Sequence, residues 1–321
     1  AISFFTFQQI AYLVDAYKGE TKEYNFLDYC LFVTFFPQLI AGPIIHHKEV
    51  MPQFADKSTY RFNPENMAVG MTIFSLGLFK KVVFADNVAV YATPIFNAVS
   101  QGNAPTLVEA WVAALAYTLQ LYFDFSGYSD MAIGIARMFG IILPINFDSP
   151  YKAISISDFW RRWHITLSNF LRDYLYIPLG GSRKGEFRRN LNLLITMLLG
   201  GLWHGAGWAF VFWGGLHGTY LVINHQYRSL RKRLGHDLKN THWFDRGCGW
   251  LLTFIAVVVG WVFFRAESMG AAFVILKGMI GLNGISITAT LPSKLIFLQN
   301  FDLQLNGFIP ILKLHKYTIN H

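Results

Sequence analysis

Residues 190–207 read Asn190-Leu-Asn-Leu-Leu-Ile-Thr-Met-Leu-Leu-Gly-Gly-Leu-Trp-His-Gly-Ala-Gly, with His204 near the end of the run. A second apolar run follows at 208–218, Trp208-Ala-Phe-Val-Phe-Trp-Gly-Gly-Leu-His-Gly. Both runs are apolar enough for a membrane, and Gly205 interrupts them directly after the histidine. Glycine allows the backbone to turn and to approach a neighbour closely. The pattern predicts two short membrane helices joined at His204.

Basic clusters flank this pair of helices on both sides: Arg183, Lys184, Arg188 and Arg189 before it, Arg228, Arg231, Lys232 and Arg233 after it. Because positive loops stay cytoplasmic, both ends are expected on the same side of the membrane. The arm 190–203 would form about 21 Å of helix, whereas the hydrocarbon core is about 30 Å thick. We therefore expect His204 to turn inside the membrane, where an ionisable group is a candidate for function.

The composition agrees with a helical membrane protein. Of 321 residues, 53% are hydrophobic, 17% aromatic and only 14% charged, whereas soluble domains have about 25% charged residues. The formal net charge of +8 suits either nucleic-acid binding or cytoplasmic loops. Lysine and arginine cluster between apolar runs, which favours loops and argues against nucleic acid. The two cysteines have no metal-type spacing and read as free thiols.

Hydropathy divides the chain into further segments. The chain begins inside an apolar run without Met, so we expect earlier spans to precede it. The expected segments are the end of a membrane helix at 1–17, a kinked or re-entrant piece at 26–45, a hydrophilic loop at 46–65, spans at 66–85, 107–123, 131–146 and 249–264, and a half-span at 271–282. A weakly patterned tail, 284–321, follows one membrane domain, 1–283. The expected fold is an all-α polytopic bundle with short re-entrant helices around a tunnel.

Residues 156–174 carry apolar side chains at helical spacing together with many basic ones. They predict one amphipathic helix along the membrane, capped by Ser157 or Asp158 and carrying His164. Its polar face consists of Arg161, Arg162, Asn169, Arg172 and Asp173. This face could bind the phosphates of a nucleotide-bearing acyl donor. Equally, it could be exposed to solvent or bind lipid headgroups.

Four other side chains are candidates from their positions. Trp203 and His204 form the turn, and Trp203 is a candidate substrate-binding residue. The imidazole of His204 is suited to accept a proton near neutral pH; the alternative for His204 is a packed helical histidine. Asp124 and Asp130 lie where one span should end and the next begin, as substrate-binding groups or as an interfacial cap or ion pair. His217 and the histidines at 46, 47, 225, 236 and 242 are assigned no role.

These segments resemble the membrane-bound O-acyltransferase (MBOAT) family, and most closely its alginate-type bacterial branch. The matching stretches begin at Ser3 (SFFTFQQI), Phe36 (FPQLIAGPI), Tyr122 (YFDFSGYSDMAIG), Asp158 (DFWRRWHITLS), Arg172 (RDYLYIPLGG) and Gly201 (GLWHG). They occur in the family's order up to about residue 265. The resemblance places the catalytic histidine of the family on His204 and its second signature histidine on His164.

The resemblance implies a membrane O-acyltransferase of the bacterial inner membrane. It would move an acyl group, expected to be acetyl, to a hydroxyl of an extracytoplasmic polysaccharide such as alginate. The donor would be a cytoplasmic thioester, either acetyl-CoA or an acyl carrier. The resemblance implies no bound cofactor or metal, and it implies a periplasmic partner protein. Acetyl or D-alanyl transfer to peptidoglycan or teichoic acid is the nearest alternative. A polysaccharide or lipid transporter without chemistry is the competing class, although no repeat of the kind that many transporters show is visible. A structural scaffold is a third possible class. It is disfavoured because the sequence places polar groups at membrane depth.

Overall fold

The computed structural model describes residues 2–21, 26–39, 42–236 and 242–285. These residues form helices and connecting segments, with no β-strand among them. In chain order the helices are α1 (Ile2–Tyr17), α2 (Phe26–Thr34), α3 (Phe36–Leu39), α4 (His47–Ala55), η1 (Lys57–Tyr60), α5 (Pro64–Phe79), η2 (Lys80–Ala85), α6 (Asp86–Ser100), α7 (Leu107–Met138), η3 (Pro150–Lys152), α8 (Ile156–Arg162), α9 (Ile165–Leu171), η4 (Arg172–Tyr176), α10 (Gly185–His204), α11 (Trp208–Arg233), α12 (Trp243–Arg265) and α13 (Met269–Met279). The all-α class is confirmed.

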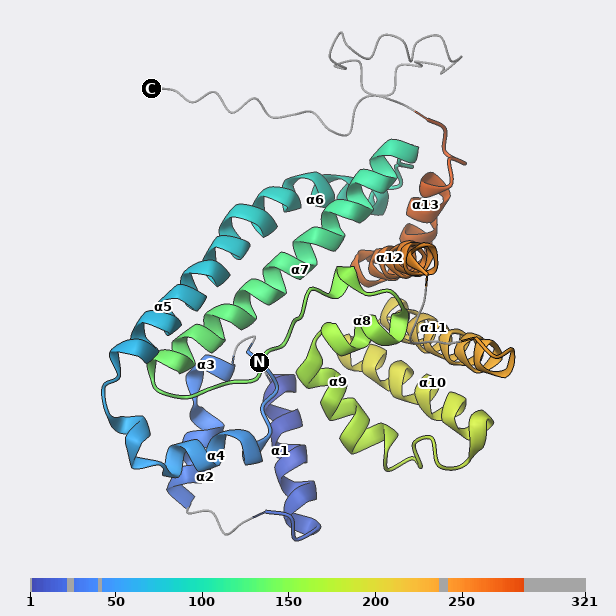
Figure 1. Cartoon of the computed structure of the whole chain (residues 1–321). Coiled ribbons are helices and arrows are strands. Elements are labelled where there is room, and N and C mark those ends of the chain that lie inside the picture. Colours follow the sequence, from blue (N-terminus) through green and yellow to red (C-terminus); the bar gives the residue numbers. More distant parts are fainter. Residues whose placement is uncertain (1, 22–25, 40–41, 237–241, 286–321) are drawn as a thin grey trace, which may run out of the picture.

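A long helical pair forms one side of the molecule (Figure 1). The helices α5, η2 and α6 continue one into the next, and α7 packs along them. Gly77 and Gly127 face each other in this pair: a Cβ atom added to Gly77 would lie 2.7 Å from the Gly127 carbonyl oxygen. No larger side chain fits at that contact, so the two backbones approach closely.

Two expected boundaries in this pair are wrong. The span predicted at 66–85 continues to Ser100, through a π-helical turn at Lys80–Ala85. The separate spans predicted at 107–123 and 131–146 are one helix, α7, followed by an extended segment. The polar residues Asp124 and Asp130, which separate the two apolar runs, lie inside α7 and do not interrupt it. Instead α7 ends where Gly140 adopts a φ of +77°.

Two stretches are long and apolar enough to cross a membrane by length and composition, Pro64–Ser100 and Trp243–Arg265. The second is α12, a helix that contains the segment 249–264 where the sequence predicts a span. Its buried face, with Val258 and Trp261, joins the largest apolar core together with residues of α7, α8, α11 and α13. The core therefore holds the two long helices and the histidine-bearing helices together.

The helices before α5, which are α1 to α4 and η1, form a smaller group below the long pair (Figure 1). The kink expected in 26–45 is present between α2 and α3. The hydrophilic loop expected at 46–65 is instead largely helical, because α4 buries Val50, Met51 and Phe54 against a second apolar cluster. Of the predicted tail 284–321, all beyond residue 285 lies outside the described residues.

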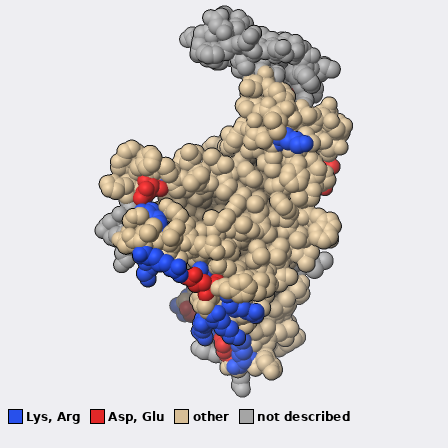
Figure 2. Space-filling model, turned by 90° about the vertical axis from the view of Figure 1, so that its right-hand side faces the viewer, with Lys and Arg blue, Asp and Glu red and all other residues tan. Residues whose placement is uncertain are grey.

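Charged side chains are unevenly distributed over the face that Figure 2 shows. Lysine and arginine gather toward its lower end, and most of the face above them carries neither sign of charge (Figure 2). A charged end beside a broad uncharged surface is typical of a protein that stands in a bilayer.

Candidate active site

His204 lies at the turn of a helical hairpin, as the sequence predicts. It is the last residue of α10, and α11 begins at Trp208. Aromatic rings surround it: the ring centroid of His204 lies 4.7 Å from that of Trp203, 5.2 Å from that of Trp213 and 5.0 Å from that of Phe264. The imidazole is half-buried in an apolar setting.

The hairpin is tight because glycines meet inside it. A Cβ atom on Gly201 would collide with the Phe210 carbonyl oxygen and lie 3.1 Å from the Cα atom of Gly214. Such a contact excludes any side chain at either position. The glycines of the motif therefore fix the spacing of α10 and α11 just before the histidine.

The expected length of the first arm is wrong. Helix α10 has 20 residues and begins at Gly185, whereas the apolar run alone suggested 14. At 1.5 Å per residue it is about 30 Å long, which matches the hydrocarbon core. The basic residues Arg188 and Arg189 belong to its first turns. The length of α10 therefore does not place His204 inside the membrane, and charge predicts only the side on which α10 begins.

The single amphipathic helix expected at 156–174 is broken at His164. Helix α8 ends at Arg162 and α9 begins at Ile165, with Ser155 as the cap of α8 in place of Ser157 or Asp158. His164 has a left-handed backbone (φ 43°, ψ 56°) and is 2% exposed. Such a conformation costs an L-residue about 1–2 kcal/mol, and outliers of this kind cluster at functional sites.

Asn146 is a site residue that sequence reasoning missed. It lies in the extended segment after α7 and is 1% exposed. Its side-chain oxygen lies 3.1 Å from Nδ1 of His164 and accepts from the hydroxyl of Thr166 at 3.0 Å. Its amide nitrogen lies 3.1 Å from the hydroxyl of Ser129. No local pattern marks Asn146, because the partners are 17 to 20 residues away along the chain.

The two signature histidines are neighbours in space. They come together although 40 residues separate them in the sequence, because α9 begins directly after His164 and packs against Trp203, the neighbour of His204. Trp203 joins the two sides: it packs with Leu167 and Leu171 of α9 and stacks on Phe7 at 5.0 Å. The turn of the α10–α11 hairpin and the α8–α9 break therefore form one site.

The predicted polar face divides into two groups. Asn169, Arg172 and Asp173 line an open pocket of about 200 Å³, together with His46 and Tyr174. Arg172 is held by Asp173 through Nε and Nη2 at 2.7 and 2.8 Å, and these hydrogen bonds raise its pKa. This pairing occupies the guanidinium that a phosphate would need.

Arg161 is not part of that pocket lining. It is exposed, and its charge acts on His225 together with those of Arg189 and Arg228. It belongs to the basic end of the α10–α11 hairpin. The polar face expected on one amphipathic helix is therefore wrong as a unit, because the break at His164 turns α9 away from the line of α8.

Asp124 and Asp130 form ion pairs on the long helical pair. Asp124 lies 2.8 Å from Nζ of Lys81, and Asp130 lies 2.5 Å from Nζ of Lys80. Both lysines belong to η2, whose π-helical turn places them beside α7. The ion pair that the sequence left as an alternative is the arrangement observed.

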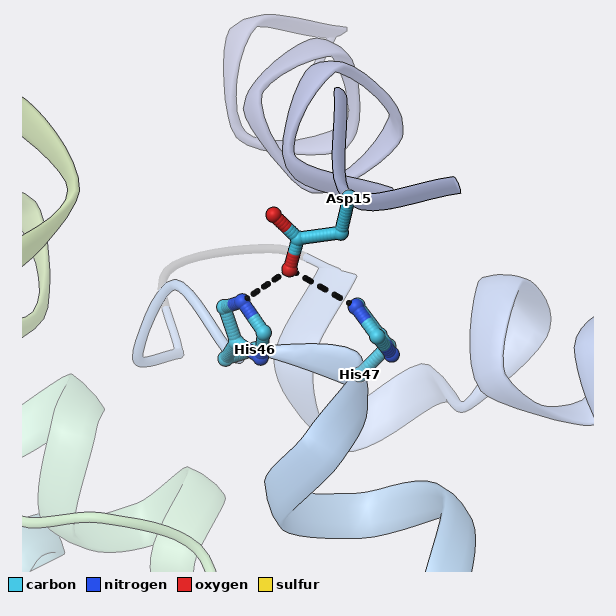
Figure 3. A group of neighbouring side chains, drawn as sticks. All are labelled: Asp15, His46 and His47. Atoms are coloured by element: carbon cyan, nitrogen blue, oxygen red, sulfur yellow. Dashed lines mark hydrogen bonds and ion pairs between the residues drawn. The ribbon is translucent and has the colours of Figure 1, made fainter. Parts of the chain in front are cut away.

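A third cluster, unassigned by the sequence, consists of Asp15, His46 and His47 (Figure 3). The Nε2 atoms of His46 and His47 lie 2.9 and 3.0 Å from Oδ2 of Asp15. The hydroxyl of Tyr174 donates to the same oxygen at 3.0 Å. Burial lowers the pKa of both histidines, so neutral imidazoles surround one buried carboxylate.

The protons in this cluster do not suit a metal ion. Nδ1 of His46 accepts the backbone N–H of Lys48 at 3.2 Å, so the proton of the neutral ring is on Nε2, the atom that would have to bind the metal. In addition, Nζ of Lys48 lies 3.4 Å from the same Asp15 oxygen. The cluster therefore joins α1, α4 and η4 through hydrogen bonds.

Comparison with known proteins gives the family. The model of the membrane-bound O-acyltransferase family matches residues 1–266. The chain is 50% identical over 313 residues to the peptidoglycan O-acetyltransferase of Helicobacter pylori, covering 89% of this chain and 58% of that protein. It is 48% identical over 272 residues to a probable alginate O-acetylase of Pseudomonas putida. This alignment covers 84% of this chain and 53% of that protein.

A more distant relative is the teichoic acid D-alanyltransferase of Streptococcus thermophilus, with 29% identity over 282 residues, 82% of this chain and 67% of that protein. The chain spans little more than half the length of the two O-acetylating relatives. The family match covers α1 to α12 and so includes both histidines of the site. By this match the chain belongs to the membrane-bound O-acyltransferase family.

Proposed function

We propose that this chain carries the catalytic membrane part of an O-acyltransferase that moves an acetyl group from a cytoplasmic thioester to a polysaccharide hydroxyl. The donor would be acetyl-CoA or an acyl-carrier thioester, consumed as substrate. The protein would be a multi-pass component of the bacterial inner membrane. Acetyl is preferred over D-alanyl because the O-acetylating relatives are 48–50% identical and the D-alanyl-transferring relative is 29% identical.

The common location of His164 and His204 carries this proposal. The two imidazoles come from separate elements that Trp203 joins, in a region lined by aromatic rings and bordered by the largest apolar core. Burying two imidazoles is costly unless they have partners or a task. A general base for acyl transfer needs this setting, because water is excluded while a neutral imidazole can still accept a proton.

The chemistry follows from the groups present. The acceptor hydroxyl would give its proton to His204 while its oxygen attacks the thioester carbonyl carbon. The carbon–sulfur bond then breaks, and the thiolate leaves with the proton that the imidazole returns. Trp203 and Trp213 flank the imidazole and restrict its ring orientation, which keeps the base aligned with the hydroxyl.

The acceptor follows the relatives in general terms. Relatives named for peptidoglycan and for alginate O-acetylation both act on polysaccharides, so we propose a polysaccharide acceptor on the extracytoplasmic side. A periplasmic partner protein that completes the transfer belongs to the same proposal. A transporter without chemistry would leave the paired histidines and the family's O-acyltransferase match without an explanation.

The direct test uses the full-length polypeptide in inner-membrane vesicles with acetyl-CoA labelled in the acetyl group. We expect release or transfer of labelled acetyl at a rate that depends on the amount of the protein. Vesicles without the protein are the control. The proposal would be contradicted if labelled acetyl leaves the donor no faster than in the control vesicles, both with acetyl-CoA and with an acetyl-loaded acyl carrier.

A further inference from the structure

Asn146 bonds to the His164 side chain through its own side chain and to the backbone of the next residue, Ile165, through its carbonyl group. Its backbone carbonyl accepts the N–H of Ile165 at 2.9 Å, and the N–H of Asp148 donates to the carbonyl of Arg162 at the same distance. The extended segment 146–148 is thus bonded to the chain on both sides of His164. These bonds stabilise the left-handed backbone at that residue.

The orientation of the Asn146 amide follows from its partners. Amide oxygen and nitrogen must be assigned from the hydrogen-bond network. The atom beside His164 also faces the backbone N–H of Thr166, at 3.3 Å. The hydroxyl of Thr166 accepts the N–H of Ile44 at 2.9 Å, so its own proton is available for Asn146. An atom that faces these donors is the oxygen.

This assignment fixes the proton on His164. Because Nδ1 lies 3.1 Å from an oxygen that only accepts, the neutral ring carries its proton on Nδ1. The lone pair is then on Nε2. Two rings restrict rotation of the imidazole. The ring of Phe125 lies edge to face with it, with 4.7 Å between the ring centroids, and the ring of Phe147 stacks on it with 6.3 Å between centroids. Ring orientation and tautomer are therefore both set by surrounding residues.

We propose that Asn146 is a positioning residue of acyl transfer, which keeps His164 in the Nδ1–H tautomer and so makes Nε2 a proton acceptor in the site shared with His204. The proposal rests on the proposed function for its kinetic part. Its structural part, the tautomer, is independent of activity. A histidine held in the wrong tautomer loses its use as a base even when its geometry is kept.

Three variants separate positioning from simple packing. Asn146→Leu removes the acceptor. Asn146→Asp keeps an oxygen for His164 and adds a charge. Ser129→Ala is the matched control, because it removes the partner of the Asn146 amide nitrogen in the same buried cluster and leaves the bond to His164. Nitrogen NMR of histidine-labelled protein in lipid nanodiscs reports the tautomer, and His164→Gln identifies the signal.

We expect the Nδ1–H tautomer at His164 in the wild type and in Ser129→Ala, and a mixture of tautomers in Asn146→Leu. Turnover should fall at least about tenfold in Asn146→Leu and recover in part in Asn146→Asp. In that variant the acid limb of the pH–rate profile should move to higher pH, because a carboxylate favours the imidazolium.

A proton on Nε2 in the wild type would overturn the proposal. So would wild-type turnover in Asn146→Leu, or equal losses of turnover in Asn146→Leu and Ser129→Ala without any change of tautomer. A protein that shows the expected tautomer but transfers no acyl group from any donor would contradict the proposed function and leave the structural assignment standing.

Discussion

The hydroxyl of Ser229 lies 3.1 Å from a carboxylate oxygen of Glu186, which joins the end of α11 to the start of α10. Arg233 reaches the same carboxylate at 3.6 Å. The two basic ends of the histidine hairpin therefore lie side by side. This places the segments 180–189 and 225–236 on one face of the molecule, and their positive charge predicts that this face is cytoplasmic.

Single cysteines at Ser182 and His236, both exposed, test this topology in a background without Cys30 and Cys248. We expect an impermeant thiol reagent to label both positions from the cytoplasmic face and neither from the other. Labelling of the two positions from opposite faces would mean that the pair crosses the membrane once, and the hairpin would have to be abandoned.

The packing of the hairpin predicts a sharp difference between neighbouring glycines. Gly214→Ala places a methyl group against the Met197 carbonyl oxygen, whereas Gly215→Ala meets only the tip of Leu198, at 3.3 Å. We expect Gly214→Ala to lower the stability by about 1–3 kcal/mol and to reduce turnover by displacing His204. Melting temperatures and initial rates of both variants measure this. Equal effects at the two positions would show that backbone contact does not set the hairpin.

The ion pairs on the long helices predict a rescue. Lys80→Met leaves Asp130 without the partner that lies 2.5 Å away, and an unpaired charge within a membrane helix is costly. We expect the single variant to lower the melting temperature in nanodiscs, and the double variant Lys80→Met, Asp130→Leu to recover most of the loss. A double variant no more stable than the single one would argue against the pair as the cause.

The Asp15 cluster predicts a pH dependence of stability. Burial lowers the pKa of His47 in the folded protein, whereas an unfolded histidine titrates near 6.5. Above that pH the residue is neutral in both states. As the pH falls below it, the unfolded state binds the proton first, so stability is lost.

His47→Gln keeps a donor for Asp15 and removes the titration. We therefore expect its melting temperature to fall less than that of the wild type between about pH 6.5 and 5. His236→Gln, at an exposed histidine, is the control and should follow the wild type. If the melting temperatures of His47→Gln and of the wild type fall in parallel as the pH is lowered, His47 is excluded as the titrating group.

The sequence predicted those features of the fold that depend on residues close together in the chain, and it missed those that depend on distant residues. The hairpin turn at His204 could be predicted because glycine and the end of an apolar run both mark it. The break at His164 could not, since Trp163-His164-Ile165 contains no helix breaker and the left-handed backbone depends on Asn146, 18 residues away. The cluster at Asp15 is non-local in the same way, with His47 32 residues further on. The continuity of α7 was missed because the carboxylates of Asp124 and Asp130 suggested the end of a span, whereas they pair with Lys81 and Lys80 of η2 inside one helix.

The central claim is that His204 is the base that accepts the proton of the attacking hydroxyl. The most direct measurement is the rate of labelled acetyl transfer in vesicles by His204→Ala, with His225→Ala on the same hairpin as the control. We expect a loss of at least about 100-fold for His204→Ala at normal expression and insertion, and near-normal transfer for His225→Ala. A His204→Ala protein that keeps more than about a tenth of the wild-type rate would contradict the account, because removal of a general base should cost about 100-fold or more.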